Sequence, residues 1–522
     1  MQFIRLSLSF LFSCMFTVLP ILGRVQIASV PSGRIDSLGI EMSALPALNE
    51  ENLDSILDLV AATGVSYIRQ EFNWTWIETS PDVYDWSAAI PLDRLVSTAS
   101  AHGIQVVAVL TGGPAYLAAE GQPVDRPAFR DRWAKFVQAA VNHFGESVDI
   151  WEIGESPNSD HALSSFLYPL SPQEVTAPNP AFYTKLLNTA AKIIRQADPN
   201  DQIWLGSLTG LTAETCAMNP LTFILEIHGA KGWNDFDSIP YVPDQGIAAP
   251  EEPSSGSVNS ACASSLTTLP NSMSDELTEV QELARQLGGK TVLVTGLGWN
   301  EQELDQLSQN RQVSPDQVEA DLLVRATAML TGENVIPIVF WHSDLSANLS
   351  SRNSIHNLQQ ALHHNIRPLG SDKTSDPALR VYRFRNGGKT TLLAWRIQDG
   401  DEAVPVALIA GDIPSFTVWA ADSSDLSPAS GSILQAGTKG KVGLNLSERP
   451  QILIGRSGDV AVIVRQILED QVQLLEIEAR SLAERLLNEA KKEAMILLEK
   501  EWEKAKDSAL EWGEDQLNEL FH

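Results

Sequence analysis

Three short segments of this sequence combine apolar, strand-like runs with side chains that can bind or transfer protons. The first contains Arg69 and Glu71, the second contains Glu152 and Glu155, and the third, residues 292–298, has no carboxylate. Carboxyl groups act as acids, bases or nucleophiles when burial or a nearby charge tunes their pKa. We expect Arg69 to be buried and to pair with Glu155 or Glu71, because an unpaired buried charge is costly.

These segments belong to a repeating pattern that begins near residue 36, in which short β-branched runs alternate with amphipathic helical stretches. The predicted strands are Ser37–Met42, Ser66–Gln70, Gln105–Leu110, Asp149–Ile153, Gln202–Leu205, Phe236–Pro240, Thr291–Thr295 and Val335–Trp341. The predicted helices include Asn52–Ala62, Pro91–His102, Arg126–His143, Pro180–Gln196, Ser274–Leu287 and Ser314–Leu330. Eight strand–helix repeats predict an α/β fold, a closed (β/α)8 barrel over residues 34–368. An open doubly wound sheet is disfavoured, since no Gly-rich phosphate loop follows the first strand.

The barrel is followed by two further predicted units. Strand-like runs separated by turn residues predict a small antiparallel β-sandwich over residues 374–457. Residues 460–522 predict a long helix, in which apolar residues alternate steps of four and three at Leu468, Val472, Leu475, Ala479, Leu482 and Leu486. This helix either packs back on the barrel or mediates self-association or partner binding, and the regular seam favours the second interpretation.

Composition and the N-terminus bear on location and partners. The net charge of −29 argues against nucleic acid, whose phosphates would be repelled, and against anionic lipid. Arg5 precedes an apolar run over residues 6–22, which predicts a secretory signal peptide within residues 1–24. An uncleaved N-terminal anchor is the alternative. In either case we expect the protein to lie outside the cytoplasm, secreted or membrane-anchored.

Cysteine and histidine usage gives a weaker signal. Cys216 and Cys262 both fall in a loop-rich region, residues 207–270, and an oxidising compartment would let them pair. Two unpaired structural cysteines are an open alternative. The nine histidines show no metal-ligand spacing, so we predict no metal and no cofactor.

Three motifs, in order and spacing, resemble the barrel enzymes of glycoside hydrolase clan A, closest to families 39 and 5. The matching segments are Tyr67-Ile68-Arg69-Gln70-Glu71-Phe72-Asn73-Trp74, Trp151-Glu152-Ile153-Gly154-Glu155-Ser156-Pro157-Asn158 and Val294-Thr295-Gly296-Leu297-Gly298-Trp299. They are similar to the second-, fourth- and seventh-strand signatures of the clan, and the resemblance covers roughly residues 36–456. The resemblance implies hydrolysis of O-glycosides by two carboxyl groups at the C-terminal ends of strands four and seven.

The departures from the clan pattern bear directly on activity. Ser156 stands at the position of the acid/base glutamate, and Gly296 stands at the position of the nucleophile. A serine hydroxyl is too weakly acidic to protonate a leaving glycoside at neutral pH, and glycine has no side chain. The sequence therefore predicts a non-catalytic member, with no catalytic residue at either position.

Glu155 carries the alternative interpretation, an active O-glycoside hydrolase. It lies one residue before the acid/base position, and a one-residue shift in a strand points a side chain to the opposite face. A bulge or a loop change at Gly154 would restore its direction. An unrecognised second carboxylate would still be needed, because residues 292–298 contain none.

The aromatic residues near the strand ends suggest what the cleft binds. If the clan geometry holds, Trp74, Trp299 and Trp341 line the mouth, and Tyr116 and Tyr241 lie near it. Aromatic faces stack on sugar rings, so we predict binding of an oligosaccharide or polysaccharide without turnover, or a role in cell-surface assembly. Packing in the core or at the rim is the alternative for each ring, and a purely structural, oligomerising protein is the alternative for the chain. The predicted ligand-binding set is Arg69, Trp74, Glu155, Ser156, Tyr241, Trp299 and Trp341.

Overall fold

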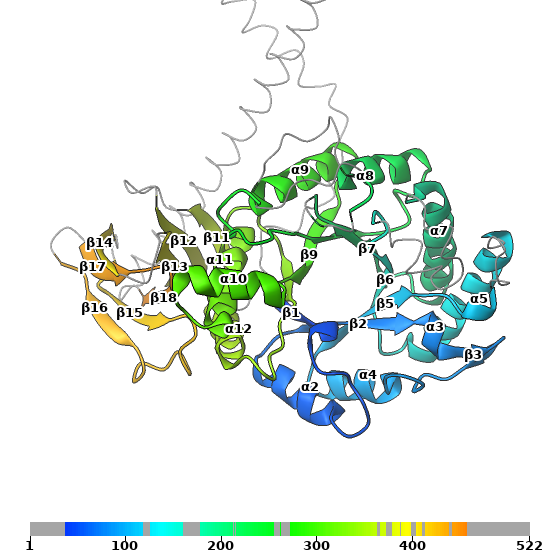
Figure 1. The fold of residues 1–522 in the computed structure, drawn as a ribbon, viewed down its shortest axis with the longest axis horizontal. Helices are drawn as coiled ribbons and strands as arrows, with labels where there is room; N and C mark the ends of the chain where they lie inside the picture. The colour runs from blue at the N-terminus through cyan, green and yellow to red at the C-terminus, as the bar shows by residue number, and fades with distance from the viewer. Residues whose placement is uncertain are drawn as a thin grey trace, which may run out of the picture.

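The structure, a computed structural model, describes residues 37–456 except 118–125, 160–177, 212, 214–215, 255–261, 263–271, 363–365, 372–377, 387, 398–402, 410–412 and 438–440. The predicted leader in residues 1–24 and the predicted helix in residues 460–522 lie outside the described residues. Figure 1 shows a barrel surrounded by helices, with a smaller β domain beside helices α10, α11 and α12.

Eight parallel strands form the predicted closed barrel, in the order β1-β10-β9-β8-β7-β6-β5-β2. In chain order they are β1 (Ser37–Glu41), β2 (Tyr67–Asn73), β5 (Gln105–Thr111), β6 (Ile150–Glu155), β7 (Gln202–Thr209), β8 (Ser238–Val242), β9 (Thr291–Leu297) and β10 (Ile338–Trp341). Each of the eight overlaps a predicted strand, so the fold class is confirmed.

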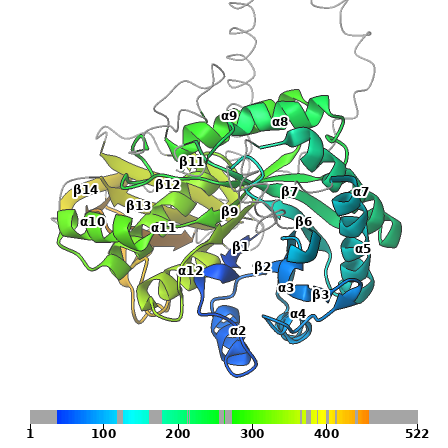
Figure 2. The same ribbon diagram turned by 45° about the vertical axis from the view of Figure 1, so that its right-hand side comes forward.

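Helices cover the outside of the barrel, as Figure 2 also shows. They are α2 (Leu53–Ala62), α4 (Leu92–Ala101), α5 (Arg126–Phe144), α7 (Pro180–Ala197), α8 (Pro220–Gly229), α9 (Met273–Gln286), α10 (Glu301–Arg311), α11 (Pro315–Gly332) and α12 (Leu349–Leu362). Three of these, α8, α10 and α12, were not among the predicted helices. A single-turn helix, α3 (Trp74–Ile77), and the small hairpin β3 (Glu78–Ser80) and β4 (Val83–Tyr84) follow β2 directly.

The inside of the barrel is filled by side chains. One apolar cluster takes residues from six strands, with Tyr67, Val107 and Ile150 among them, and Phe340 closing it from β10. Because alternate strand residues face the same side, Arg69 and Glu71 on β2 and Glu152 on β6 point inward above this layer. The C-terminal half of the barrel interior is therefore polar.

The second domain is antiparallel, as predicted. A six-stranded sheet has the order β11-β12-β13-β18-β15-β16, and β14 and β17 form a separate pair. The strands are β11 (Arg367–Ser371), β12 (Leu379–Asn386), β13 (Lys389–Arg396), β14 (Val404–Ile409), β15 (Ser415–Ala420), β16 (Ser432–Gln435), β17 (Lys441–Leu446) and β18 (Gln451–Arg456). β11 and β16 were not predicted, and because β11 pairs with β12, the sheet begins before residue 374.

A buried ion-pair network joins the two domains. Arg325 on α11 bonds Glu251, in the segment after β8, through Nη2 at 2.6 Å. Glu251 also accepts a hydrogen bond from the indole of Trp395 on β13. Arg311 on α10 contacts Glu448, which follows β17, at 2.6 Å. These contacts fix the sandwich against the barrel.

Candidate functional site

Arg69 organises the polar end of the barrel interior. Its side chain is 2% exposed, and Nε and Nη2 donate to the two carboxylate oxygens of Glu152 at 2.7 and 2.8 Å. Nη1 lies 2.5 Å from Glu41 and 3.3 Å from Glu155. The expected burial and the expected pairing with Glu155 are both observed. The two closest partners, Glu152 and Glu41, were not anticipated.

Further hydrogen bonds fix Glu152 in this arrangement. Its Oε1 accepts from the backbone N–H of Ser207 at 2.9 Å and from the Ser207 hydroxyl at 2.6 Å. That hydroxyl is 2.7 Å from the hydroxyl of Thr295 on β9. Ser207 faces inward because β7 contains one extra residue relative to β8 between Trp204 and Leu208. This fully satisfied, buried network is a rigid base for the groups above it.

Glu155 points into the barrel mouth. Gly154 adopts φ +78°, a left-handed conformation that glycine reaches without steric cost. This turn at the end of β6 brings the Glu155 side chain, 33% exposed, to Arg69. The change of direction that the sequence left open at Gly154 is thus present.

Glu71 shares a hydrogen bond with Glu155 across the mouth. Burial, together with this hydrogen bond, raises the pKa of Glu71 to about 8. Burial also acts on Glu155, but attraction to Arg69 and the hydrogen bonds from Glu71 and Arg69 outweigh it and lower its pKa. At neutral pH, Glu71 is therefore the protonated donor and Glu155 is the carboxylate acceptor.

Two more titratable groups surround this pair. Burial raises the pKa of Glu41 to about 7, against the opposing attraction of Arg69. His342 follows β10, keeps solvent-exposed surface, and interacts electrostatically with Glu155. Its desolvation by surrounding protein atoms lowers its pKa, so the imidazole is neutral at pH 7. The mouth therefore presents one carboxylic acid, one carboxylate and one neutral imidazole to the solvent side.

The motif resemblance matches Ser156 and Gly296 to the positions of the clan's catalytic glutamates. Ser156 has φ +46°, a conformation uncommon for a residue with a side chain, and its carbonyl accepts hydrogen bonds from Ser159. A Cβ added at Gly296 would lie 3.1 Å from the Val242 side chain. A larger side chain at Gly296 would require Val242 to move.

Trp74 does not line the mouth, and this expectation is corrected. The ring is fully buried and packs against Phe129, Trp133 and Phe136, and its indole N–H donates to Glu78. Trp74 starts α3, immediately after β2, and this short helix directs its ring into the outer core. Its role in the structure is packing.

Tyr241 and Trp341 are also corrected, for a common reason. Each is fully buried and is directed outward from its strand, toward the helices. The Tyr241 hydroxyl donates to Glu276 on α9 at 2.7 Å, and the Trp341 indole donates to Thr327 on α11 at 2.9 Å. The neighbouring residue Phe340 faces inward, so strand alternation excludes Trp341 from the interior.

Trp299 and Tyr116, both named from the sequence, and Trp76, which was not, lie in segments that follow barrel strands. Trp299 is 5% exposed and its indole N–H has no hydrogen-bond partner in the described part of the chain. It follows Gly298, which packs closely against the backbone of His342. Trp76 on α3 is 47% exposed and Tyr116, just after β5, is 42% exposed. Trp76 lies two residues after the buried Trp74 in the same helical turn, and no local pattern in the sequence distinguishes the exposed ring from the buried one.

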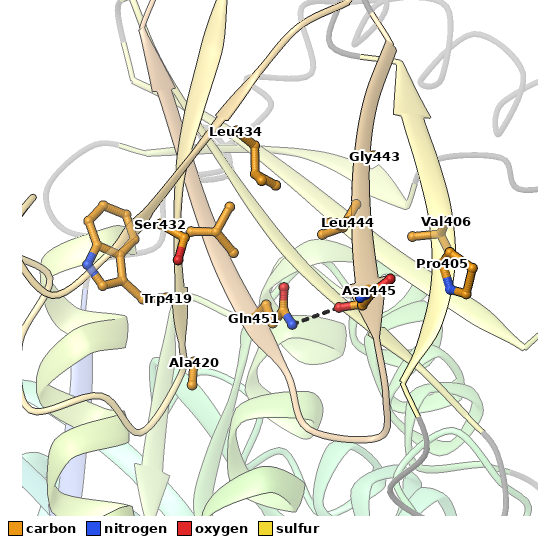
Figure 3. A pocket seen from close by; sticks show the side chains of 11 residues that line it. Pro405, Val406, Trp419, Ala420, Ser432, Leu434, Gly443, Leu444, Asn445 and Gln451 are labelled. Atoms are coloured by element: carbon orange, nitrogen blue, oxygen red, sulfur yellow. Dashed lines mark hydrogen bonds between the residues drawn. The ribbon is translucent and has the colours of Figure 1, made fainter.

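A groove also lies in the β-sandwich (Figure 3). This groove has a volume of about 490 Å³ and lies between the β14–β17 pair and strands β15, β16 and β18. Its polar side chains include Ser432, Asn445 and Gln451, and Gln451 donates to the backbone carbonyl of Asn445 at 2.9 Å. None of its lining residues is titratable, so acid–base chemistry belongs at the barrel mouth.

Other features bear on location and on metals. Cys216, in the segment after β7, forms a disulfide with Cys262, in the segment after β8. No helix within the described residues is both long and apolar enough to cross a membrane. In the same part of the chain, no group of three or more His, Cys, Asp or Glu side chains is arranged to hold a metal ion.

Comparison with solved structures supports the fold resemblance that the motifs indicated. A family 39 glycoside hydrolase from Bacteroides cellulosilyticus WH2 superposes with a TM-score of 0.61 at 18% identity, over 81% of each chain. A GH30 endoxylanase from Clostridium papyrosolvens C71 has a TM-score of 0.51 at 13% identity, over 81% of this chain and 97% of that one. A conserved exported protein from Bacteroides fragilis has a TM-score of 0.54 at 10% identity, over 81% and 97% respectively.

Sequence comparison adds nothing to these likenesses. No protein-family model matches the chain, and no curated protein sequence matches it. At identities of 10–18%, the structural likeness concerns the fold: this chain has the (β/α)8 barrel of clan A glycoside hydrolases, with the accompanying β domain.

Proposed function

We propose that this protein binds saccharide chains at the mouth of its barrel without hydrolysing them. The observation that carries the proposal is the hydrogen bond between Glu71 and Glu155. Retaining glycosidases hold their two carboxyl groups about 5–5.5 Å apart, and inverting ones hold them about 6.5–9.5 Å apart. Two carboxyl groups in direct hydrogen-bond contact leave no space for a glycosidic oxygen between them.

The two positions of the clan's catalytic glutamates support the same proposal. Ser156 cannot act as the acid, and Gly296 cannot act as the nucleophile. The Val242 side chain packs against Gly296, so no neighbouring acid fills that place from β8. The segments that follow the barrel strands nevertheless carry the exposed side chains of Trp76, Tyr116 and His342 as well as the partly exposed Glu155, and such aromatic and polar groups suit saccharide recognition.

The second candidate is an O-glycoside hydrolase that uses Glu71 and Glu155. One observation favours it: the pKa of Glu71 is raised to about 8 while that of Glu155 is lowered, and acid–base pairs in enzymes show such a separation. In that case the substrate would have to separate the two groups on binding. Glu71 would then protonate the leaving oxygen and Glu155 would activate water or attack the sugar.

One experiment separates the two candidates. The full chain is titrated with soluble plant and bacterial polysaccharide fragments, and reducing-end release is followed over a day, with Glu155→Gln in parallel. We expect binding without release of reducing ends. Release that is lost in Glu155→Gln would establish the hydrolase, and no binding at millimolar ligand would leave the barrel a structural unit. Glu226→Gln, on the outer face of α8, is the matched control for the loss of one carboxylate.

We also propose that the protein is exported and assembles through residues 460–522. The Cys216–Cys262 disulfide supports export, because disulfides persist in oxidising compartments. The regular apolar seam in residues 468–486 supports assembly. Light scattering of the full chain and of a variant ending at residue 457 tests this second proposal. A full chain that is monomeric at micromolar concentration would contradict it.

A further inference from the structure

A cavity lies in the outer layer of the barrel, where helices α5 and α7 begin, and is called the basic pocket below. It has a volume of about 280 Å³ and is lined by Arg126, Arg130 and Lys185, together with Asn179 and Phe182. Three of the seven described residues that line it are cationic, and none of the seven is acidic. The whole chain, in contrast, has 66 Asp and Glu against 37 Lys and Arg. A cavity lined by charges of one sign attracts ligands of the opposite sign, so the basic pocket suits an anion.

Two packed helices hold the three cations in place. Arg126 and Arg130 are four residues apart in the first two turns of α5, so they share one face of that helix. Lys185 belongs to the second turn of α7, which lies beside α5 (Figure 1). The Trp133 indole on α5 donates to the backbone carbonyl of Leu186 on α7 at 3.1 Å. The cations are thus carried by rigid elements, as a preformed binding site requires.

The charges in the basic pocket are largely uncompensated by protein acids. The guanidinium of Arg126 lies over the Phe182 ring, 5.3 Å from its centroid. Among the described residues, no carboxylate lies within ion-pair distance of Arg126 or Lys185. Arg130 contacts Asp131 at 3.5 Å, but both side chains are exposed, and such a pair contributes little. An anionic ligand would therefore supply the missing counter-charge.

The ends of the two helices add to the positive potential. The helices have 19 and 18 residues, and the N-terminus of a helix carries a partial positive charge. Asn179 caps α7 through Oδ1, which accepts from the backbone N–H of Phe182 at 2.9 Å. Its amide N–H groups remain as donors, because in the described part of the chain they have no acceptor. The helix ends and this amide thus support the same ligand chemistry as the three cations.

The basic pocket lies on the side of the barrel that carries the mouth. Helices α5 and α7 follow strands β5 and β6, so their first turns lie at the C-terminal ends of those strands. The hydroxyl of Tyr183, in the first turn of α7, donates to the backbone carbonyl of Ile153 on β6 at 2.7 Å. Glu155 is the last residue of the same strand. A saccharide chain that leaves the mouth across β6 would therefore meet the basic pocket.

We infer that the ligand is an acidic saccharide, whose carboxylate or sulfate group binds between Arg126, Arg130 and Lys185. This inference rests on the proposed saccharide-binding function and names its ligand class. Guanidinium and ammonium groups make short, charge-assisted hydrogen bonds to such oxyanions. The volume of the pocket is close to the lower end of the range for small-ligand sites. The net charge of −29 does not oppose this binding, because exposed charges farther away than about 8 Å are screened at physiological salt.

Two matched pairs of tetrasaccharides test the inference by calorimetry on the full chain at pH 7. The first pair is α-1,4-linked tetragalacturonate and its full methyl ester, which differ only in charge and methylation. The second pair is a sulfated galactan tetramer and its desulfated form. We expect at least one acidic tetramer to bind about tenfold or more tightly than its neutral counterpart, because it alone makes charge-assisted hydrogen bonds. This ratio should fall severalfold between about 0.05 M and about 0.5 M sodium chloride.

Variants assign the preference to the basic pocket. Arg126→Gln and Lys185→Gln should each weaken binding of the acidic tetramer by about 3–10-fold and leave binding of the neutral one unchanged. Combining Arg126→Gln with Arg130→Gln should remove the preference. Lys192→Gln is the matched control, because Lys192 is exposed on the same helix as Lys185 and does not line the pocket. It should leave the ratio of affinities unchanged.

Each outcome has one meaning. Equal affinities within both pairs would overturn the inference and leave saccharide binding intact. A preference that persists in the Arg126→Gln, Arg130→Gln double variant would overturn the assignment to the basic pocket. Inorganic sulfate or phosphate that binds as tightly as the acidic tetramer would overturn the role of the sugar. Failure of all four tetramers to bind at millimolar concentration would overturn the proposed function as well. Near-ultraviolet circular dichroism shows whether each variant is folded, and Lys185→Gln gives an independent test if an arginine variant is not.

Discussion

The shared proton between Glu71 and Glu155 has a consequence for stability that needs no ligand. Glu71→Gln keeps the hydrogen bond, because an amide N–H can donate to Glu155 as the protonated acid does. The substitution also removes the titratable carboxyl group at position 71. Comparing the free energy of unfolding of Glu71→Gln with that of the unsubstituted protein, as a function of pH, therefore isolates the proton held by Glu71.

The sign and the size of this difference in unfolding free energy follow from the pKa of Glu71 in the unfolded and the folded protein. In the unfolded chain, a glutamate has a pKa of about 4.3, whereas burial and the bond to Glu155 raise the pKa of Glu71 to about 8 in the folded protein. A raised folded-state pKa contributes stability below pH 4 that is lost as the pH rises toward 8, at up to about 1.4 kcal/mol per pH unit. After a discount for its partial exposure, Glu71→Gln should gain about 2–4 kcal/mol over the unsubstituted protein between pH 5 and pH 8.

Urea unfolding at pH 5, 6, 7 and 8 measures this difference. Glu41, Glu276 and Asp321 also have pKa values raised to about 7, but they contribute equally to both proteins and cancel. Glu226→Gln should follow the unsubstituted protein at every pH. Parallel pH profiles for Glu71→Gln and the unsubstituted protein would refute the assignment of a proton to Glu71.

Two further predictions concern the groups that hold the mouth together. Arg69→Met leaves Glu152 and Glu41 buried without their cation, so it should cost about 3–5 kcal/mol in urea unfolding. Adding Glu152→Gln should recover part of that cost, and a loss below about 1 kcal/mol would show that the guanidinium is not needed. Replacing Cys216 and Cys262 by serine opens a loop of sequence separation 46, which should cost about 4 kcal/mol in non-reducing thermal unfolding. An unchanged melting temperature would contradict this.

The barrel was predictable because its strands and most of its helices carry strong local patterns. The helices that were missed also carried local signals. Asn219, followed by proline, caps α8 at its first turn, and Asn300 with Glu303 forms a capping box at the start of α10. Both helices are short and lie next to loop-rich sequence.

The site was predicted in part. Which residues were predicted correctly depends on which alternate side chains of each strand face the barrel interior. Period-two alternation places Arg69, Glu71 and Glu152 on the inner face once one of them is known to face inward. The motif comparison identified the strand ends but not this parity, so Tyr241 and Trp341 were placed in the mouth although they face the helices. Glu41 is the register partner of Arg69 on the neighbouring strand β1, and the register of two parallel strands joined by a helix is not set by a local pattern in the sequence.

Four glutamates lie near Arg69, and stability explains two of them, Glu41 and Glu152, but not Glu71 and Glu155. Glu41 and Glu152 are 4% and 0% exposed and are bonded to Arg69, so they are needed to neutralise a buried guanidinium. Glu71 and Glu155 keep exposed surface, and the pair binds a proton that becomes more costly as the pH rises toward 8. An arrangement that lowers stability at neutral pH, in the mouth of a barrel, is typical of a ligand site.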